Sequence, residues 1–262
     1  SGAINIHEGD LLAKREKLLV FLKNTQLIAR KWHETSQALA PMLGLDNGNL
    51  TVTQLRQISR MALLCFAEDK PEPQWFDAKY LEEVQETVSK AKQLYQDYNL
   101  LKSRLDATYD DGFYKLNLDE LIANYSGPYQ SGMKIFNSNY HSDQKSIAKL
   151  THDGKVPKEV LQDLIDARKV NRLKEKIEAS AETVRTLLGH YYHKSRTDFS
   201  GAEKAIALAE EIRQLSWATQ IPEALLKLLT TSASPSPMIK HLGQELQSSV
   251  DKWEQQTKDI ES

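Results

Sequence analysis

The sequence predicts an all-α protein: a helical bundle that contains one long antiparallel, coiled-coil-like hairpin. Three observations predict it. Glycine and proline are scarce, apolar residues recur at helical spacing, and no stretch alternates apolar with polar residues as a strand does. The 262 residues include 11 glycines and 8 prolines, about 7% of the chain against a usual total near 12%. Helix breakers are therefore rare, and the few prolines mark where helices begin or end.

The composition is that of a soluble, globular chain. Hydrophobic residues make up 40% and charged residues 27%, with a formal net charge of −2. No uninterrupted apolar run approaches the ~20 residues that a bilayer-spanning helix needs, which excludes a transmembrane protein and predicts no membrane partner. Cys65 is the single cysteine. An internal disulfide and a cysteine-rich zinc site are therefore excluded, and a reducing, cytoplasmic location is expected.

Four segments are expected along the chain. Residues 1–9 form a tail whose Ser1-Gly2-Ala3 start resembles a cloning or protease-cleavage scar, which suggests a piece excised from a longer polypeptide. Residues 10–76 hold N-terminal helices, residues 77–189 hold the hairpin with its aromatic-rich connection, and residues 190–262 hold C-terminal helices. Together they make one compact domain or two loosely separated helical domains.

The N-terminal segment predicts two helices. The first covers residues 10–40, with Asp10 as its cap. Its apolar stripe consists of Leu11, Leu12, Leu18, Leu19, Leu22, Leu27 and Ile28. A loop at 42–49 follows, and a shorter helix begins near Thr53. This second helix carries Cys65 on its apolar side, where we expect a small core residue.

Two long apolar stripes predict the hairpin. The first consists of Leu81, Val84, Val88, Ala91, Tyr95, Tyr98, Leu101 and Leu105. The second helix begins at Pro157, and its stripe consists of Val160, Leu164, Ala167, Val170 or Asn171, Leu173, Ile177, Ala181, Val184 and Leu188. Each helix is about 30 residues, or ~45 Å, long. Residues 77–105 and 157–188 are therefore expected to pack antiparallel; the alternative is two core helices of an ordinary bundle.

Shorter helices are expected in the rest of the chain. Between the two long helices, Asn117 caps a short helix, and another runs from Gly127-Pro128 to Leu150. The C-terminal helices are expected at about 198–215, capped by Thr197 or Asp198, at 225–229, opened by Pro222, and at 238–258.

Motifs of catalysis and cofactor binding are absent. The phosphate-binding loop G-x-x-x-x-G-K-[ST], the dinucleotide fingerprint G-x-G-x-x-G, and the motifs G-x-S-x-G and H-E-x-x-H do not occur. The spacing of His190 and His193 would allow them to bind a metal ion together with Asp198. The neighbouring tyrosines, Lys194 and Arg196 make the surroundings aromatic and cationic, which suits no common metal. We therefore expect no enzyme activity, no catalytic residue, no metal and no cofactor, and neither binding nor hydrolysis of ATP.

Positive charge gathers in one part of the chain. Residues 134–196 carry 13 Lys and Arg against 8 Asp and Glu. Six cations are candidates for contact with a nucleic-acid backbone: Lys145, Lys149, Arg168, Lys169, Arg172 and Lys176. Lys169, Arg172 and Lys176 share one helix face because they are spaced by three and four. The alternative is a plain solvated face, because four acids are interleaved and can pair locally: Asp163, Asp166, Glu175 and Glu178.

The residues from Leu105 to Leu215 resemble a known helical insertion. The matching stretches are Tyr109-Asp110, Met133-Lys134-Ile135-Phe136, Leu188-Gly189 and Thr197-Asp198-Phe199. In these features the chain resembles the stalk-like helical insertion of large bacterial superfamily 1 helicase-related ATPases, which interrupts their first RecA-like motor domain. The Leu-Gly and Thr-Asp-Phe corners are the distinctive part of this resemblance.

The resemblance implies an accessory segment of an ATP-driven nucleic-acid motor. No motor or nuclease residue is carried over, because no position here matches one. The expected function is a non-catalytic insertion domain that guides DNA or RNA or docks a protein partner, with the motor domains of the parent polypeptide as its neighbours. The alternative is a helical protein–protein interaction scaffold with no nucleic-acid role. Salt dependence distinguishes the two, because phosphate contacts weaken steeply as salt rises.

Overall fold

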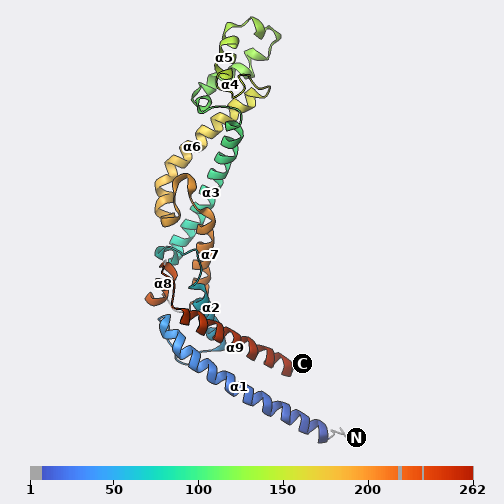
Figure 1. Cartoon of the computed structure of the whole chain (residues 1–262), viewed down its shortest axis with the longest axis vertical. Coiled ribbons are helices and arrows are strands. Elements are labelled where there is room, and N and C mark those ends of the chain that lie inside the picture. Colours follow the sequence, from blue (N-terminus) through green and yellow to red (C-terminus); the bar gives the residue numbers. More distant parts are fainter. Residues whose placement is uncertain (1–7, 218–219, 232, 262) are drawn as a thin grey trace. The chain divides into compact units, whose positions relative to one another are not determined.

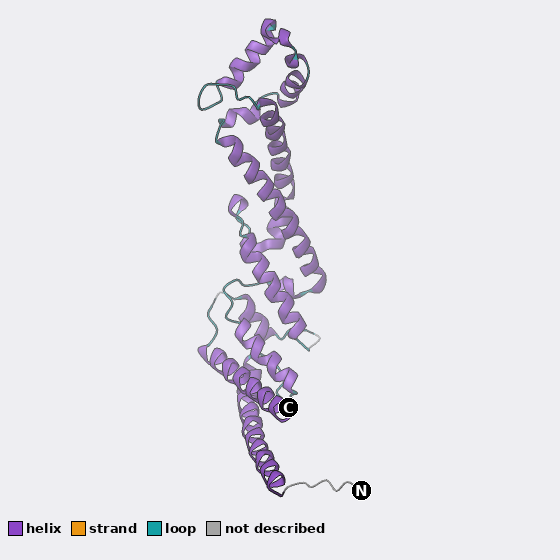
Figure 2. Cartoon of the chain, turned by 90° about the vertical axis from the view of Figure 1, so that its right-hand side faces the viewer, coloured by secondary structure: helices purple, strands orange, loops and turns teal. Residues whose placement is uncertain are grey.

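The computed structural model describes residues 8–217, 220–231 and 233–261, and the predicted all-α class is confirmed for these residues. They contain nine α-helices, several short 3-10 turns and no strand (Figures 1 and 2). The expected tail start, Ser1-Gly2-Ala3, lies outside the described residues. No described helix is both long enough and apolar enough to cross a bilayer.

The chain divides into two units with separate cores, which are described one at a time. The first unit combines residues 1–81 with residues 201–262, so it contains both ends of the chain. The second unit is the continuous stretch 82–200. The aromatic residues separate in the same way. All four tryptophans belong to the first unit, and nine of the ten tyrosines belong to the second. Tryptophan and tyrosine signals therefore report on different units.

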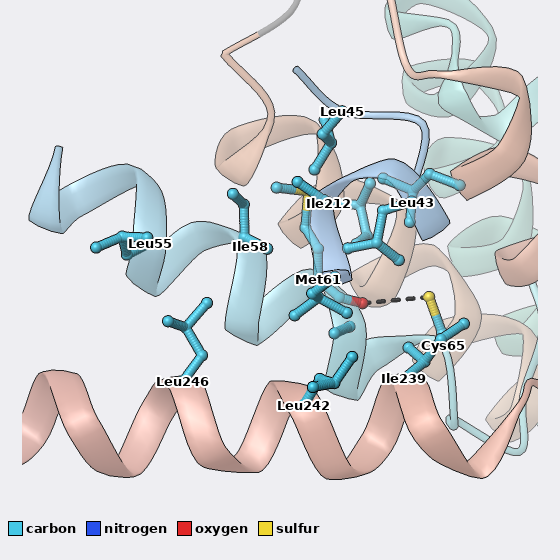
Figure 3. Close-up of a cluster of buried hydrophobic side chains, with 14 of the residues drawn as sticks. Leu43, Leu45, Leu55, Ile58, Met61, Cys65, Ile212, Ile239, Leu242 and Leu246 are labelled. Carbon is cyan, nitrogen blue, oxygen red and sulfur yellow. Dashed lines mark hydrogen bonds between the residues drawn. The ribbon is translucent and has the colours of Figure 1, made fainter. Parts of the chain in front are cut away.

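The first unit is built on helices from the two ends of the chain. It contains α1 (Glu8–Met42), α2 (Val52–Leu64), most of α7 (Phe199–Leu215), α8 (Glu223–Thr230) and α9 (Pro237–Glu261). Its core gathers Leu43, Leu45, Leu55, Ile58, Met61, Cys65, Ile212, Ile239, Leu242 and Leu246, as Figure 3 shows. The three C-terminal helices lie close to their predicted positions.

Local signals explain where α2 begins and how closely it approaches α9. Thr51 and Gln54 form a capping box: the Thr51 side chain accepts from the Gln54 N–H, and the Gln54 side chain accepts from the Thr51 N–H. The two helices meet at Gly243, where an added Cβ would lie 3.0 Å from the Ala62 Cβ and 3.4 Å from the Ser59 carbonyl oxygen. The close approach of the helices therefore leaves little room for a side chain at this position.

The apolar stripe predicted for α1 does not form the side of the helix that faces the core. Leu18, Leu19, Leu22 and Leu27 are between 47% and 68% exposed. The side of α1 that meets α9 carries Trp32, whose ring makes an edge contact of 5.6 Å with Trp253. The helix begins at Glu8, so Asp10 is not its cap. The side chains of Leu11 and Leu12 lie outside the described part.

Cys65 is a buried core residue, as predicted. Its side chain is fully buried, and its Sγ donates to the Met61 carbonyl oxygen at 3.3 Å. Burial raises the pKa of the Cys65 thiol to about 12. Because the thiolate is the reactive form, we expect the folded chain to resist maleimide at neutral pH and to react fully in denaturant. Mass spectrometry measures the labelled fraction, and rapid labelling in native buffer would contradict this burial.

The second unit carries the two long helices, α3 (Ala78–Asp106) and α6 (Val160–Leu188), with α4 (Leu118–Ser126) and α5 (Ser138–Ala148) between them in sequence. The Arg104 guanidinium donates to Asp166 and lies 3.4 Å from Asp163. Leu105 shares a core with Leu164. The end of α3 therefore contacts the beginning of α6. A seam along the whole length of both helices stays a prediction.

Two boundaries in this unit differ from the predictions. The helix expected from Gly127 to Leu150 is interrupted by two 3-10 turns, Pro128–Gln130 and Gly132–Phe136, before α5 begins. The extended backbone of Asn137 causes the break, and its side chain then caps α5. The second long helix begins at Val160 rather than Pro157. The short helix capped by Asn117 is confirmed as α4.

Three tyrosine–aspartate hydrogen bonds fix the segment between the long helices. The hydroxyls of Tyr109, Tyr114 and Tyr129 donate to Asp163 at 2.9 Å, to Asp106 at 2.7 Å and to Asp143 at 2.7 Å. Tyr109 and Phe113 also stack, with ring centres 3.7 Å apart. Most of the aromatic rings in this segment therefore serve the core of the unit.

Backbone hydrogen bonds close this segment on itself. Tyr109 and Thr151 form an isolated antiparallel bridge. Beside it, the Asp110 N–H donates to the Leu150 carbonyl at 2.8 Å, and the His152 N–H donates to the Thr108 carbonyl at 3.0 Å. The first and last residues of the stretch 109–151 are thus held side by side.

Candidate nucleic-acid interface

Three of the six predicted cations form an exposed row on α6. Lys169, Arg172 and Lys176, hereafter the basic row, are all exposed, whereas Leu173 is buried. Their side chains therefore lie on the solvent side of the helix. None of the three forms an ion pair within the described residues.

The interleaved acids on α6 are mostly engaged elsewhere. Asp163 and Asp166 face Arg104 of α3, and Glu178 lies 3.9 Å from Lys174. Glu175 is exposed. Local pairing with these four acids does not neutralise the basic row in this structure.

The other three predicted cations are not part of this row. Arg168 is half-buried, and its Nη1 donates to Asp119 at 2.9 Å, which ties α6 to the first turn of α4. Lys145 and Lys149 are exposed on the last turn and at the C-cap of α5. The structure thus brings together Lys169, Arg172 and Lys176 and leaves Lys145 and Lys149 on a separate helix.

A second feature, which the sequence reasoning missed, is a groove on another side of α6. Two adjoining hollows of about 390 and 340 Å³ share Tyr98 and Lys174 in their walls. The walls include four tyrosines and four lysines: Tyr95, Tyr98, Tyr114, Tyr192, Lys102, Lys115, Lys174 and Lys194. We call these eight residues the tyrosine groove. Asp111 and Glu178 are the acids of its lining.

A tight corner after α6 builds one wall of the tyrosine groove. Gly189 has φ 54° and ψ −123°, a conformation that strongly favours glycine. The Thr197 Oγ1 accepts from the His193 N–H at 3.2 Å and donates to the Lys194 carbonyl at 2.6 Å. The Asp198 N–H donates to the Tyr191 carbonyl at 3.0 Å. The Leu-Gly and Thr-Asp-Phe corners are therefore the hydrogen-bonded frame of this wall.

The frame also fixes Tyr95, one of the residues that line the larger hollow. The Tyr95 ring makes an edge contact with Phe199 at 5.3 Å. Its hydroxyl shares hydrogen bonds with the side chains of Tyr192 and Thr197, and burial together with the nearby Tyr192 raises its pKa. The Tyr95 ring is therefore held in a fixed position by Phe199, Tyr192 and Thr197.

The smaller hollow is fixed by a second network. The Lys102 ammonium lies 4.8 Å from the centre of the Tyr114 ring and forms ion pairs with Asp106 and Asp111. The Asn171 amide donates to the Tyr114 carbonyl at 2.8 Å. Lys102 is thus paired with carboxylates and Lys174 has a longer contact with Glu178, whereas Lys115 and Lys194 form no ion pair within the described residues.

The sequence contained a weak signal for this groove. Tyr95 and Tyr98 occupy two positions of the first apolar stripe, where a buried seam would ordinarily carry aliphatic residues. Both are only half-buried. Tyrosines at seam positions, beside lysines, indicate a seam that opens to water.

Other predicted candidates have ordinary contacts. The His190 ring packs against Tyr191 at 4.1 Å. Within the described residues, no group of three His, Cys, Asp or Glu side chains is arranged to hold a metal ion. Comparison of the chain with protein-family models, with curated proteins and with solved structures found no match.

Proposed function

We propose that this chain is a non-catalytic helical module that contacts the phosphate backbone of nucleic acid through α6. The observation that carries the proposal is the basic row, three exposed cations without a carboxylate partner among the described residues. Its first and last members are seven residues apart, or ~10 Å along the helix. Three phosphate contacts release about as many counterions, so log K should fall with log salt with a slope of about −3.

We further propose that the chain works as part of a larger protein that contains motor domains. The resemblance of residues 105–215 to the insertion of superfamily 1 helicase-related ATPases supports an accessory role beside motor domains. In that role α3 and α6 form the long antiparallel hairpin along which the basic row is displayed. Contacts to phosphates carry no base information, so we expect binding to be indifferent to sequence.

Charge reversal tests the basic row. The triple variant Lys169→Glu, Arg172→Glu, Lys176→Glu should lose duplex binding with little change in melting temperature, because exposed charges contribute little to stability. Fluorescence anisotropy over a salt series measures the affinity and its slope. The matched control is Lys14→Glu, Lys17→Glu, Lys23→Glu, the same charge change on exposed positions of α1. If both triple variants bind as the parent does, the basic row is only a solvated face.

A protein-binding role is the second candidate, and one observation favours it. Ile135 and Phe136 are 57% and 80% exposed in the aromatic segment between the long helices. Exposed apolar side chains next to each other are typical of contact surfaces. An association through this surface should persist as salt rises, and Phe136→Ser should weaken it. Association that disappears at moderate salt would exclude this role.

A further inference from the structure

We infer that the tyrosine groove binds the unstacked bases of single-stranded nucleic acid. Both hollows have the volume of ordinary small-molecule pockets, which begin at ~300 Å³. Their walls combine aromatic rings with lysines, the two components that single-strand-binding surfaces use. The inference extends the proposed function to a different face of α6, and it rests on that function only in taking nucleic acid as the ligand.

The tyrosines suit stacking because they are held in place yet incompletely covered. Tyr95, Tyr98, Tyr114 and Tyr192 are all half-buried, so each ring retains accessible surface. Tyr95 is fixed by Phe199 and by hydrogen bonds to Tyr192 and Thr197. Rings that are already ordered lose little conformational entropy when a base stacks on them. Every base has an aromatic face, so this contact tolerates any sequence.

The lysines suit the strand that connects the bases. Lys174 belongs to both hollows, and Lys115 and Lys194 belong to one each. Lys174 lies 3.9 Å from Glu178, a long contact that leaves ammonium hydrogens available. Lys115 and Lys194 are exposed, and neither forms an ion pair within the described residues. A strand crossing the two hollows would therefore pass three ammonium groups.

Lys194 adds an independent observation. It has φ 54°, and it is the single non-glycine residue with positive φ in the described chain. The left-handed conformation is unfavourable for a lysine, and such outliers concentrate at binding sites. Thr197 holds it there by accepting from the His193 N–H and donating to the Lys194 carbonyl. The fold thus maintains a locally strained turn that displays a lysine at the groove.

The groove and the basic row are separable. Successive helix residues are turned by about 100°, so Lys174 points away from Arg172 and Lys176, which lie two positions to either side. A duplex bound to the basic row lies on a different face of α6 from the groove. Base pairing also keeps the bases of a duplex stacked inside the double helix, where the tyrosines cannot contact their faces. The groove therefore predicts a preference for single strands over duplex.

The experiment compares a short fluorescein-labelled oligothymidylate with a duplex of equal length. The parent chain should bind the single strand more tightly. The variant Tyr98→Leu, Tyr192→Leu keeps apolar volume but removes two stacking faces, and it should weaken single-strand binding at least tenfold and duplex binding less than twofold. Tyr98→Phe, Tyr192→Phe should retain the affinity. Trp217→Leu, at an exposed aromatic residue of the first unit outside the groove, is the matched control.

Two further variants change only exposed lysines, so that their effect on binding does not depend on a change in folding. Lys174→Gln and Lys194→Gln change lysine side chains at the groove wall, and each should lower the salt slope for the single strand by about one. Thermal unfolding followed by circular dichroism confirms that all variants are folded.

Three results would overturn the inference: equal affinity for single strand and duplex, unchanged single-strand affinity in the double leucine variant, or equal affinity for thymidine monophosphate and the oligomer. The last would mean a free-nucleotide pocket. The same measurements also test the basic row and the tyrosine groove separately. If the basic-row triple variant loses duplex binding while the leucine variant retains the single strand, only the groove fails. If the leucine variant loses the single strand and the triple variant behaves as the parent, only the basic row fails.

Discussion

Above about pH 10 the second unit is expected to lose stability steeply, and three buried tyrosines alone account for about 4 kcal/mol for each pH unit. The cause is a set of tyrosines that the fold keeps protonated. Burial is the main factor that raises the pKa of Tyr125 to about 12. Burial, followed by hydrogen bonds to Asp163 and Asp143, raises the pKa of Tyr109 and of Tyr129. All three are at most 7% exposed.

The direction follows from which state holds more protons. In the unfolded chain tyrosines ionise near pH 10. In the folded unit Tyr109, Tyr125 and Tyr129 stay neutral at that pH, because the tyrosinate would be buried, in two cases against a carboxylate. Their stabilising contribution is complete below pH 10 and is lost as the pH rises through the folded pKa values. Each tyrosine contributes a slope of about 1.4 kcal/mol per pH unit.

Urea unfolding followed by tyrosine absorbance measures this slope, since nine of the ten tyrosines lie in the second unit. Tyr129→Phe removes one titrating group and should flatten the slope by about 1.4 kcal/mol per pH unit, although the lost bond to Asp143 costs about 1 kcal/mol at neutral pH. Tryptophan fluorescence reports the first unit separately. A stability that is level from pH 9 to pH 11 would contradict the buried, protonated tyrosines.

Gly243→Val should destabilise the first unit by about 3 kcal/mol. Its Cβ would lie 3.0 Å from the Ala62 Cβ and 3.4 Å from the Ser59 carbonyl oxygen, and the two methyl groups extend further into α2. The two helices must separate to admit them, which opens the core around Met61 and Leu242. Urea unfolding monitored by tryptophan fluorescence measures the loss, because all four tryptophans belong to this unit.

Two companion variants distinguish crowding from other causes. Gly243→Ala places one tight contact against Ala62, but alanine favours the helix by about 1 kcal/mol, so its net effect should be within about 1 kcal/mol of zero. Adding Ala62→Gly to Gly243→Val creates room and should restore part of the stability in a double-mutant cycle. If the two substitutions are simply additive, crowding at this crossing is not the cause.

Helix positions were largely predictable from this sequence because proline, glycine and cap residues are local signals. Asn117 caps α4, and Pro222 precedes α8, as expected. The stretch 127–150 was mispredicted because its break depends on the extended backbone at Asn137, which no proline marks. Which helices pack against each other was not predictable, because periodicity shows that a helix has an apolar side but does not show which helix covers that side. The exposed Leu18 and Leu27 of α1 illustrate this.

The candidate site was predictable in part for the same reason. Lys169, Arg172 and Lys176 lie on one face through spacing within a single helix, and the structure leaves them exposed. The tyrosine groove joins residues that are far apart in sequence, such as Tyr98 and Tyr192, and it depends on the corner at Gly189. Only the fold brings them together.

The closed stretch 109–151 has a consequence for how this protein tolerates changes in length. Its two ends are joined by the Tyr109–Thr151 bridge and by flanking backbone hydrogen bonds. Residues inserted at the exposed Ser131, between the two 3-10 turns, would lengthen a connection whose exit and return points are already fixed, and doubling a flexible loop costs only about 0.6 kcal/mol. The stretch is thus a natural position for splicing in a tag, a reporter domain or a binding peptide while the paths of α3 and α6 stay unchanged.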